Sequence, residues 1–279
     1  MLGSGFVQAF QRRGVNVRVW NRTFEKAKAL EAYGAQAFES PAQAARGASR
    51  VHVCVRSDDS VDSTLDAALE GIAPGTPVIG HTTVLPQNVE PRRRRLHERG
   101  IPFLHAPVFM GPPNAAAATG LMLASGDKAL FERVRGSLEA MTGTVWYLGE
   151  RSDTAAVFKL MGNAMILAVI GGLSDMFAIA QANGIDRQSA YTLFEKYSPS
   201  GQITGRGKRM AQGDYEPTWT LDMALKDADL MLQTAQGCDL HVIGAVERLL
   251  REASARGFGE LDLGAIAQVP ASAAEAASR

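Results

Sequence analysis

Lys159 and Asn163 are a polar pair with the residue types and spacing to move a proton. They lie four residues apart in an apolar segment, so in a helix both side chains project from one face. An amine in apolar surroundings has a lowered pKa, which lets it donate and accept a proton near neutral pH. The alternative is a structural pair near the start of the helix. The segment alone leaves both interpretations open.

A second candidate group, Asn21-Arg22-Thr23, directly follows a predicted strand at 15–20. In dinucleotide-binding βαβ units, a residue after the second strand contacts the adenosine ribose. An acidic residue there favours NAD, whereas an arginine can pair with the 2′-phosphate of NADP. We therefore expect NADP, with NAD as the second choice. In the alternative interpretation, Thr23 only caps the next helix and Arg22 precedes it.

The N-terminal segment corresponds to the middle of the same βαβ unit rather than to its start. Met1-Leu2-Gly3-Ser4-Gly5 leads into an amphipathic helix, and the strand at 15–20 follows at the usual distance. A G-x-G-x-x-G loop normally joins a first strand to this helix. Gly3 occupies the place of the third glycine, and the first strand and first two glycines are missing. We expect the chain as written to bind its cofactor poorly, and an upstream start codon would supply the strand.

Short strand-like runs alternate with helical stretches through the first 150 residues. This order predicts βαβ units and a Rossmann-type parallel sheet, here without its first strand. The predicted strands are 15–20, 51–55, 78–79, 103–104, 121–124 and 145–148, and the predicted helices are 3–13, 23–33, 60–69, 86–99 and 128–141.

No strand is predicted after residue 150. The segment 154–182 is apolar on nearly every face and ends at Asn183-Gly184, a suitable C-cap. It predicts one long helix of about 43 Å at 1.5 Å per residue. Such a helix must be covered by partners, so we expect a homodimer or a higher homo-oligomer. Its most apolar part, 164–173, is shorter than the roughly 20 residues of a membrane span, which favours a buried helix in a soluble protein.

The fold class that follows is α/β, with a Rossmann-type sheet, a long helix and an all-helical C-terminal domain. The predicted domains are an NADP-binding domain at 1–151, a helical substrate and dimerisation domain at 152–268, and a disordered tail at 269–279.

Charge and composition exclude several classes of protein. Lys plus Arg and Asp plus Glu both number 29, so no net charge attracts nucleic acid or membrane. The basic run Arg92–Arg95 has no interleaved aromatic residues and is interpreted as a solvated helix face. The N-terminus lacks the basic and apolar parts of a signal peptide, which favours a cytoplasmic protein.

The cysteines and histidines give no sign of a metal site. Cys54 and Cys238 are far apart and are expected to be buried reduced thiols. The five histidines show no metal-ligand spacing, so no metal is predicted. His81 and His105 lie at strand ends, where structural roles are favoured over contact with a substrate.

Short motifs along nearly the whole chain together resemble the β-hydroxyacid dehydrogenase family. These are the 3-hydroxyisobutyrate dehydrogenase-like enzymes of the 6-phosphogluconate dehydrogenase superfamily. Each motif is short, but the order and spacing of the set are specific. The matching segments are 19–23, 78–86, 105–108, 119–123, 159–163 and 225–227.

The resemblance implies a role for each matching residue. Lys159 would be the general acid/base, and Asn163 would help to hold the substrate. Thr83 would lie beside the nicotinamide, and Lys226 would close over cofactor and substrate from the helical domain. Motif and resemblance together give the cofactor-binding positions Gly3, Asn21, Arg22, Thr23, Val55, Arg56, Thr83 and Lys226, with Ser60 nearby.

Two further departures from the family bear on the substrate. Phe109-Met110-Gly111 stands where the family has Ser-Gly-Gly, which cradles a substrate carboxylate. Phe109 cannot donate a hydrogen bond and Met110 crowds the backbone, so this substrate-contacting segment predicts a more apolar pocket. Arg151 replaces part of a glycine-rich turn, as a solvated loop charge or, less favoured, as an anion anchor.

These observations predict an NADP-dependent oxidoreductase. It would transfer hydride between nicotinamide and a hydroxy acid or related carbonyl compound, with Lys159 moving the proton. Imine reductases share the two-domain layout but generally lack the lysine, so Lys159 argues against that subgroup. The alternative is a degenerate, non-catalytic dimer that acts as a binding or scaffold protein because its dinucleotide loop is incomplete.

Overall fold

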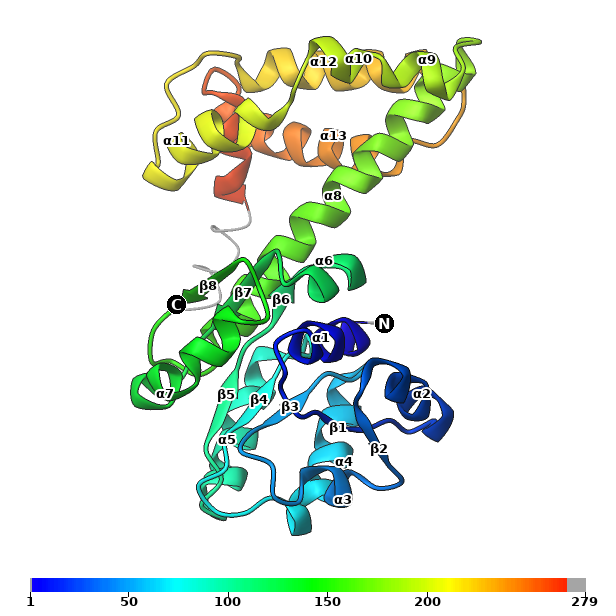
Figure 1. The fold of residues 1–279 in the computed structure, drawn as a ribbon. Coiled ribbons are helices and arrows are strands. Elements are labelled where there is room, and N and C mark those ends of the chain that lie inside the picture. The colour runs from blue at the N-terminus through cyan, green and yellow to red at the C-terminus, as the bar shows by residue number, and fades with distance from the viewer. Residues whose placement is uncertain (1, 270–279) are drawn as a thin grey trace. The chain divides into compact units, whose positions relative to one another are not determined.

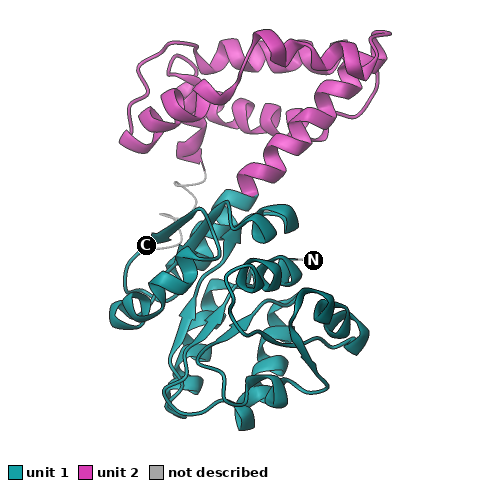
Figure 2. Ribbon diagram, viewed as in Figure 1, with its two compact units in different colours: residues 1–163 teal, residues 164–279 magenta. Residues whose placement is uncertain are grey.

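The computed structural model describes residues 2–269, which fall into two compact units. Figure 2 colours unit 1, residues 1–163, and unit 2, residues 164–279. The two units join inside the long helix, at Asn163 and Ala164. The domain boundary expected after residue 151 stays a prediction. Residues 270–279, nearly all of the predicted tail, lie outside the described residues.

The described strands of unit 1 are short and form three sheets (Figure 1). The strands are β1 (Arg18–Trp20), β2 (Gln36–Phe38), β3 (Val51–Val53), β4 (Val78–Gly80), β5 (Phe103–His105), β6 (Val108–Phe109), β7 (Leu121–Ala124) and β8 (Thr144–Tyr147). Their orders are β1-β2, β3-β4-β5 and β6-β7-β8. The single parallel sheet expected from the sequence is therefore divided.

Strand direction is parallel in every pair of these sheets except one. β6 runs antiparallel to β7, because the chain reverses direction through α6 (Pro112–Ala117) between them. In the described residues neither β1 nor β3 pairs with a strand on its other side. A first strand encoded upstream of Met1, as expected from the sequence, stays a prediction.

The helices of unit 1 cover both faces of β3-β4-β5, except for the helix after β1, which packs against β1-β2. They are α1 (Leu2–Gln11), α2 (Phe24–Lys28), α3 (Pro41–Ala45), α4 (Asp58–Ala68), α5 (Val89–His97), α6 and α7 (Lys128–Glu139). Side chains alternate along a strand, so Val78 and Phe103 point into one apolar cluster and Ile79 and Leu104 into another. Four short elements of six residues or fewer are not predicted from the sequence: β2, α3, β6 and α6.

Helix α8 (Thr154–Ala182) has the predicted bounds, and Gly184 follows it with a positive φ of 73°. The remaining helices of unit 2 are α9 (Arg187–Tyr191), α10 (Leu193–Lys196), α11 (Gly207–Gln212), α12 (Leu221–Thr234) and α13 (His241–Ala253). α12 and α13 pack through buried Leu221, Leu250 and Ala253.

Asp175 is the buried acid that fixes α13 against α8 in unit 2. Its Oδ2 accepts the backbone N–H groups of Val242 and Ile243 at 2.9 and 2.8 Å. These are orphan donors at the start of α13, whose own N-cap residue, Leu240, offers no side-chain acceptor. A carboxylate on α8 therefore caps α13 and also meets the positive end of its dipole.

The expectation of a buried α8 is wrong for the isolated chain. Six large apolar side chains on it are each more than half exposed, and we call them the apolar α8 surface: Met161, Met165, Ile166, Leu167, Val169 and Ile170. By length and composition alone α8 could cross a membrane, a test that core helices of soluble proteins also pass. Cys238 is also exposed rather than buried, and both cysteines are free.

Candidate functional site

Asn21, Arg22 and Thr23 form an exposed corner directly after β1. The Asn21 Oδ1 atom accepts the Thr23 backbone N–H at 3.0 Å, which fixes the turn. Thr23 is the N-cap residue of α2, but its hydroxyl accepts no capping hydrogen bond. Arg22 makes no hydrogen bond or ion pair with any residue that the structure describes. Its guanidinium is therefore free to meet an anion.

The segments that follow β3 and β4 are tied together by Thr82. Its buried Oγ1 accepts the Val55 N–H at 3.0 Å and donates to the Val55 carbonyl at 3.2 Å. The next side chain, Thr83, is exposed, as is Arg56, while Ser60 lies in the first turn of α4. The hydrogen bonds of Thr82 thus hold Val55 and Thr83 beside each other at the carboxyl ends of parallel strands, where α/β proteins bind ligands.

A directional hydrogen-bond chain runs from Arg50 through His52, both partly buried, to the buried His81. His81 Nδ1 lies 2.7 Å from the Ala106 carbonyl and so must carry a proton. His81 Nε2 then accepts, so the donor at 2.9 Å is His52 Nδ1. His52 Nε2 accepts in turn from Arg50 Nε at 3.2 Å. Each partner fixes one neutral tautomer, which ties β3 to the ends of β4 and β5.

Burial keeps the strand-end histidines neutral. It lowers the pKa of His81 to about 4, a shift partly opposed by the hydrogen bond to Ala106. Burial, followed by the charge of Arg92, lowers the pKa of His105 to about 3. Both side chains are enclosed in the core. Their surroundings are consistent with the structural role favoured for them from the sequence.

The interpretation of Arg92–Arg95 as a solvated face is wrong for Arg92, which is only 3% exposed. Its Nη2 atom donates to Asp58 Oδ1 at 2.6 Å, and its Nε atom donates to Asp62 Oδ1 at 2.8 Å. Arg95 pairs one turn along with Asp62 and Asp66. The carboxylates at every fourth position of α4 therefore form ion pairs with Arg92 and Arg95 of α5.

Asp58 also connects this ion pair to the loop after β4. Its Oδ2 atom accepts the Leu85 N–H at 2.9 Å and the Asn88 amide at 2.8 Å. Burial raises the pKa of Asp58, but the hydrogen bonds from Arg92, Leu85 and Asn88 outweigh it and hold that pKa below its ordinary value. A charged, fully bonded Asp58 thus positions the loop that carries Thr83.

Gly3 lies in the first turn of α1, where an added Cβ would meet Cys54 at an ordinary 3.8 Å. The tighter position is Gly5. A Cβ there would lie 2.7 Å from the Ala115 Cβ and 2.8 Å from the Ala116 backbone nitrogen. Close packing of α1 on α6 therefore depends on Gly5, which the sequence analysis did not select.

Lys159 lies in the second turn of α8 and is 9% exposed. Its Nζ atom donates to Asn163 Oδ1 at 2.9 Å, the contact expected from their four-residue spacing. Burial lowers the pKa of Lys159 below its ordinary value. An amine with a lowered pKa, oriented by one amide, can act as a general acid/base.

Phe109, at the end of β6, covers the Lys159 amine. The Nζ atom lies 3.9 Å from the centroid of the phenyl ring, the geometry of a cation–π contact. Met110 follows half-buried, and Gly111 is the N-cap residue of α6, donating its N–H to Asn114 Oδ1 at 3.1 Å. The structure thus brings the predicted substrate-contacting segment to the predicted proton-transfer residue.

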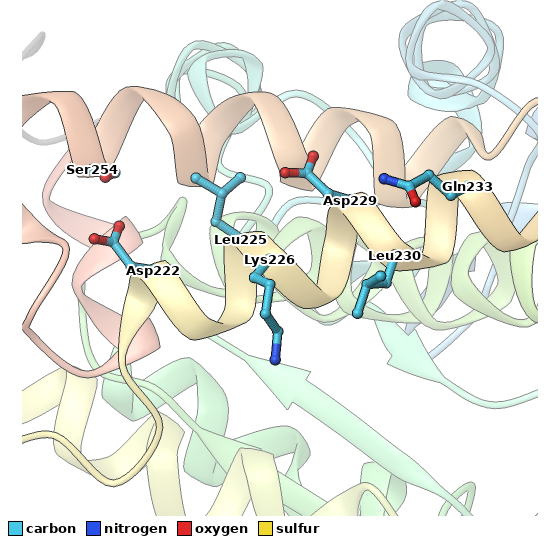
Figure 3. Close-up of a pocket in the computed structure, with 7 residues that line it drawn as sticks. All are labelled: Asp222, Leu225, Lys226, Asp229, Leu230, Gln233 and Ser254. Carbon is cyan, nitrogen blue, oxygen red and sulfur yellow. The ribbon is translucent and has the colours of Figure 1, made fainter.

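Two other candidates lie elsewhere. Lys226 projects from α12 of unit 2, largely exposed, and pairs with Asp227 Oδ1 at 3.0 Å. It lines a shallow hollow of about 480 Å³ (Figure 3), and its role toward a cofactor stays a prediction. Arg151 is exposed, and both of its hydrogen bonds go to Asp153, as expected of a loop charge.

Four positions around the site were missed from the sequence: Gly5, Thr82, Arg92 and Gly162. Gly162 lies under the Phe109 ring, which an added Cβ would overlap. A signal existed for Arg92 alone, since Asp58, Asp62 and Asp66 repeat at the helical spacing that matches it. The other three depend on contacts between segments far apart in the chain.

Comparison with known families covers almost all of this chain. The NAD binding domain of 6-phosphogluconate dehydrogenase matches residues 1–149. The family described as the NAD-binding domain of NADP-dependent 3-hydroxyisobutyrate dehydrogenase matches residues 154–269. The resemblance inferred from short motifs is thereby confirmed.

Similar proteins align over nearly all of the chain. An uncharacterized oxidoreductase of Bacillus subtilis, YfjR, is 27% identical and aligns over 95% of each chain. The L-threonate dehydrogenase of Cupriavidus necator is 26% identical over 96% of this chain and 92% of its own.

A solved structure shares the fold. It is an imine reductase from Myxococcus stipitatus in complex with NADP+, with a TM-score of 0.89, 22% identity and 96% coverage of both chains. The chain therefore belongs to the β-hydroxyacid dehydrogenase family of NAD(P)-dependent oxidoreductases, related to 6-phosphogluconate and 3-hydroxyisobutyrate dehydrogenases.

Proposed function

We propose that this protein transfers hydride between NADP and a hydroxy acid or related carbonyl compound, with Lys159 as the general acid/base. The observation that carries the proposal is the Lys159 amine, buried, lowered in pKa and hydrogen-bonded to Asn163. The bound nicotinamide would supply or accept the hydride. Lys159 would give a proton to the substrate oxygen during reduction and take one from the hydroxyl during oxidation.

The residues of unit 1 fit a dinucleotide with a 2′-phosphate. Arg22 is exposed, carries no competing carboxylate among the described residues and follows β1. A guanidinium can bind a phosphate through two parallel hydrogen bonds. Asn21 and Thr23 add an amide and a hydroxyl at the same corner. These features support NADP over NAD.

The test is Lys159→Ala measured with NADPH and a panel of aldehydes, ketones and hydroxy acids. We expect kcat to fall by about 10²- to 10⁴-fold, the usual contribution of a general acid/base. The Kd for NADPH, followed by nicotinamide fluorescence, should change little because Lys159 handles the substrate proton. Full turnover by the variant would remove Lys159 from the mechanism. Failure of the wild type to bind either nucleotide would favour the non-catalytic scaffold.

We also propose that a second copy of the chain covers the apolar α8 surface. Six neighbouring large apolar side chains on one helix exceed what a monomer leaves exposed without cost. Leu167→Glu would place a charge in such an interface and should shift the protein to monomers in light-scattering measurements. A monomeric wild type would contradict the proposal. The cytoplasmic location expected from the sequence stays a prediction.

A further inference from the structure

The Lys159 amine has little hydrogen-bonding capacity left for a substrate. A lysine ammonium has three N–H donors. One is directed to Asn163 Oδ1 at 2.9 Å. The face of the Phe109 ring, centred 3.9 Å from Nζ, occupies a second side of the amine. About one donor remains, which is enough for the reacting oxygen of a substrate but not for a neighbouring carboxylate as well.

The position of the Phe109 ring depends on a second residue. A Cβ on residue 162 would overlap the ring at Cζ and lie 2.7 Å from Cε1, so only glycine leaves room. Gly162 lies one turn along α8 from Lys159, against the same ring that covers the amine. Phe109 and Gly162 thus form a matched pair, although 53 positions separate them.

The ring also changes which substrates can approach. Its face is electronegative and offers no donor, so a substrate carboxylate beside it would lose water without gaining a partner. Met110, the next residue, adds apolar surface. A protonated iminium would be repelled by the charged amine and would have no lone pair to accept its hydrogen bond. A neutral carbonyl or alcohol meets neither obstacle.

We propose that Phe109, seated over Gly162, is a specificity-determining residue that selects neutral carbonyl and hydroxyl compounds over analogues with a carboxylate near the reacting carbon. The proposal rests on the proposed function, in which Lys159 exchanges the proton, and narrows its substrate from hydroxy acids to carbonyl and hydroxyl compounds without a carboxylate near the reacting carbon.

The geometric part can be tested without turnover. The rate at which Lys159 is reductively methylated by labelled formaldehyde would be followed by peptide mass spectrometry in the full chain. Phe109→Leu and Gly162→Ala should each raise this rate about three- to tenfold, because both uncover the amine and remove a cation–π contact. Phe109→Tyr keeps the ring and should keep the rate. Phe158→Leu is the matched control, since Phe158 is next to Lys159 but packs on Trp146.

Unchanged labelling in both Phe109→Leu and Gly162→Ala would overturn the proposal. Thermal unfolding of each variant separates exposure of the amine from general loosening, which the Phe158→Leu control would also produce. If Gly162→Ala fails to fold, the double variant with Phe109→Leu removes the overlap and should fold again.

The substrate class is tested with matched aldehydes, each as a carboxylate and as its methyl ester, for example 4-oxobutanoate and methyl 4-oxobutanoate. The wild type should favour the ester by about tenfold or more in kcat/KM, and Phe109→Ser should reduce that ratio about tenfold. Faster reduction of the carboxylate members, or equal rates for the carboxylate and the ester, would overturn the substrate class. Lys159→Ala keeping full activity would instead refute the proposed function, so the two failures are distinguishable.

Discussion

Two polar regions of unit 1 are built in opposite ways. What we call the buried network is two separate hydrogen-bonded pairs, His52 with His81 at 2.9 Å and Arg92 with Asp58 at 2.6 Å, in which His81 and Arg92 are buried. The exposed corner Asn21–Thr23 has one internal hydrogen bond and leaves Arg22 without a partner among the described residues. Only the first region is fixed by its own hydrogen bonds before any ligand arrives.

The difference follows from what each region has to do. A loop beside a reacting carbon has to hold its position closely, since small displacements cost large factors in rate. Buried and bonded groups provide that order, at the cost of desolvating charges. A phosphate-binding arginine has to stay hydrated and mobile until its anion arrives, and an exposed side chain does so at little cost.

The largest effect should come from breaking the buried network at Arg92. Arg92→Leu leaves Asp58 without its cation, while Asp62 keeps Arg95, and loss of one partner of a buried ion pair costs about 3–5 kcal/mol. Urea unfolding would measure the loss. Arg94→Leu is the control, because its side chain is 71% exposed and it should cost no more than about 0.5 kcal/mol. Equal losses would mean that Arg92 is not a buried anchor.

Acid should weaken the core that encloses His81 and His105. The pKa values of His81 and His105 in the folded protein are about 4 and about 3, below the ordinary 6.5. As pH falls below 6.5 the unfolded chain therefore binds protons first, and stability present above that pH is lost. Between pH 6.5 and 5.5 we expect to lose about 1 kcal/mol for each histidine. His81→Asn should reduce this slope, and an unchanged slope would contradict it.

Sequence reasoning was most accurate where the pattern is local. Helix α8 has its predicted bounds because its apolar residues and its C-cap are contiguous, and β7 has its predicted bounds of 121–124. The Lys159–Asn163 contact follows from helical geometry alone. Family membership likewise came from short motifs in a fixed order.

The errors occurred where the partner is distant in sequence. Arg92 lies in a run of four arginines, and only the carboxylates of α4 decide that it is buried. Residue 162 has to be a glycine because any Cβ there would overlap the ring of Phe109, which lies on another segment. Burial of α8 was predicted from its composition, but composition does not say whether the cover comes from the same chain.

The exposed corner should show its effect in cofactor choice rather than in stability. Arg22→Gln removes one charged hydrogen-bond donor to the 2′-phosphate, a contact worth about 1.5–3 kcal/mol. The preference for NADPH over NADH should therefore fall by about tenfold or more, as measured by the ratio of Kd values. The unfolding free energy should stay within about 0.5 kcal/mol of wild type. Arg46→Gln, a change at another exposed arginine, should alter neither quantity. An unchanged preference would exclude Arg22 from the phosphate site.

The smallest effect should separate the two neighbouring threonines. Thr82→Val keeps the shape of the side chain but removes the acceptor for the Val55 N–H and the donor to its carbonyl, so we expect a loss of about 1 kcal/mol in unfolding free energy. Thr83→Val, next to it and exposed, should cost almost nothing in stability. If Thr83 lies beside the nicotinamide, its substitution should instead raise the Kd for NADPH. Equal stability losses at both positions would mean that Thr82 does not order the loop, and the contrast between a fixed interior and an open corner would then rest on Arg92 and the histidines alone.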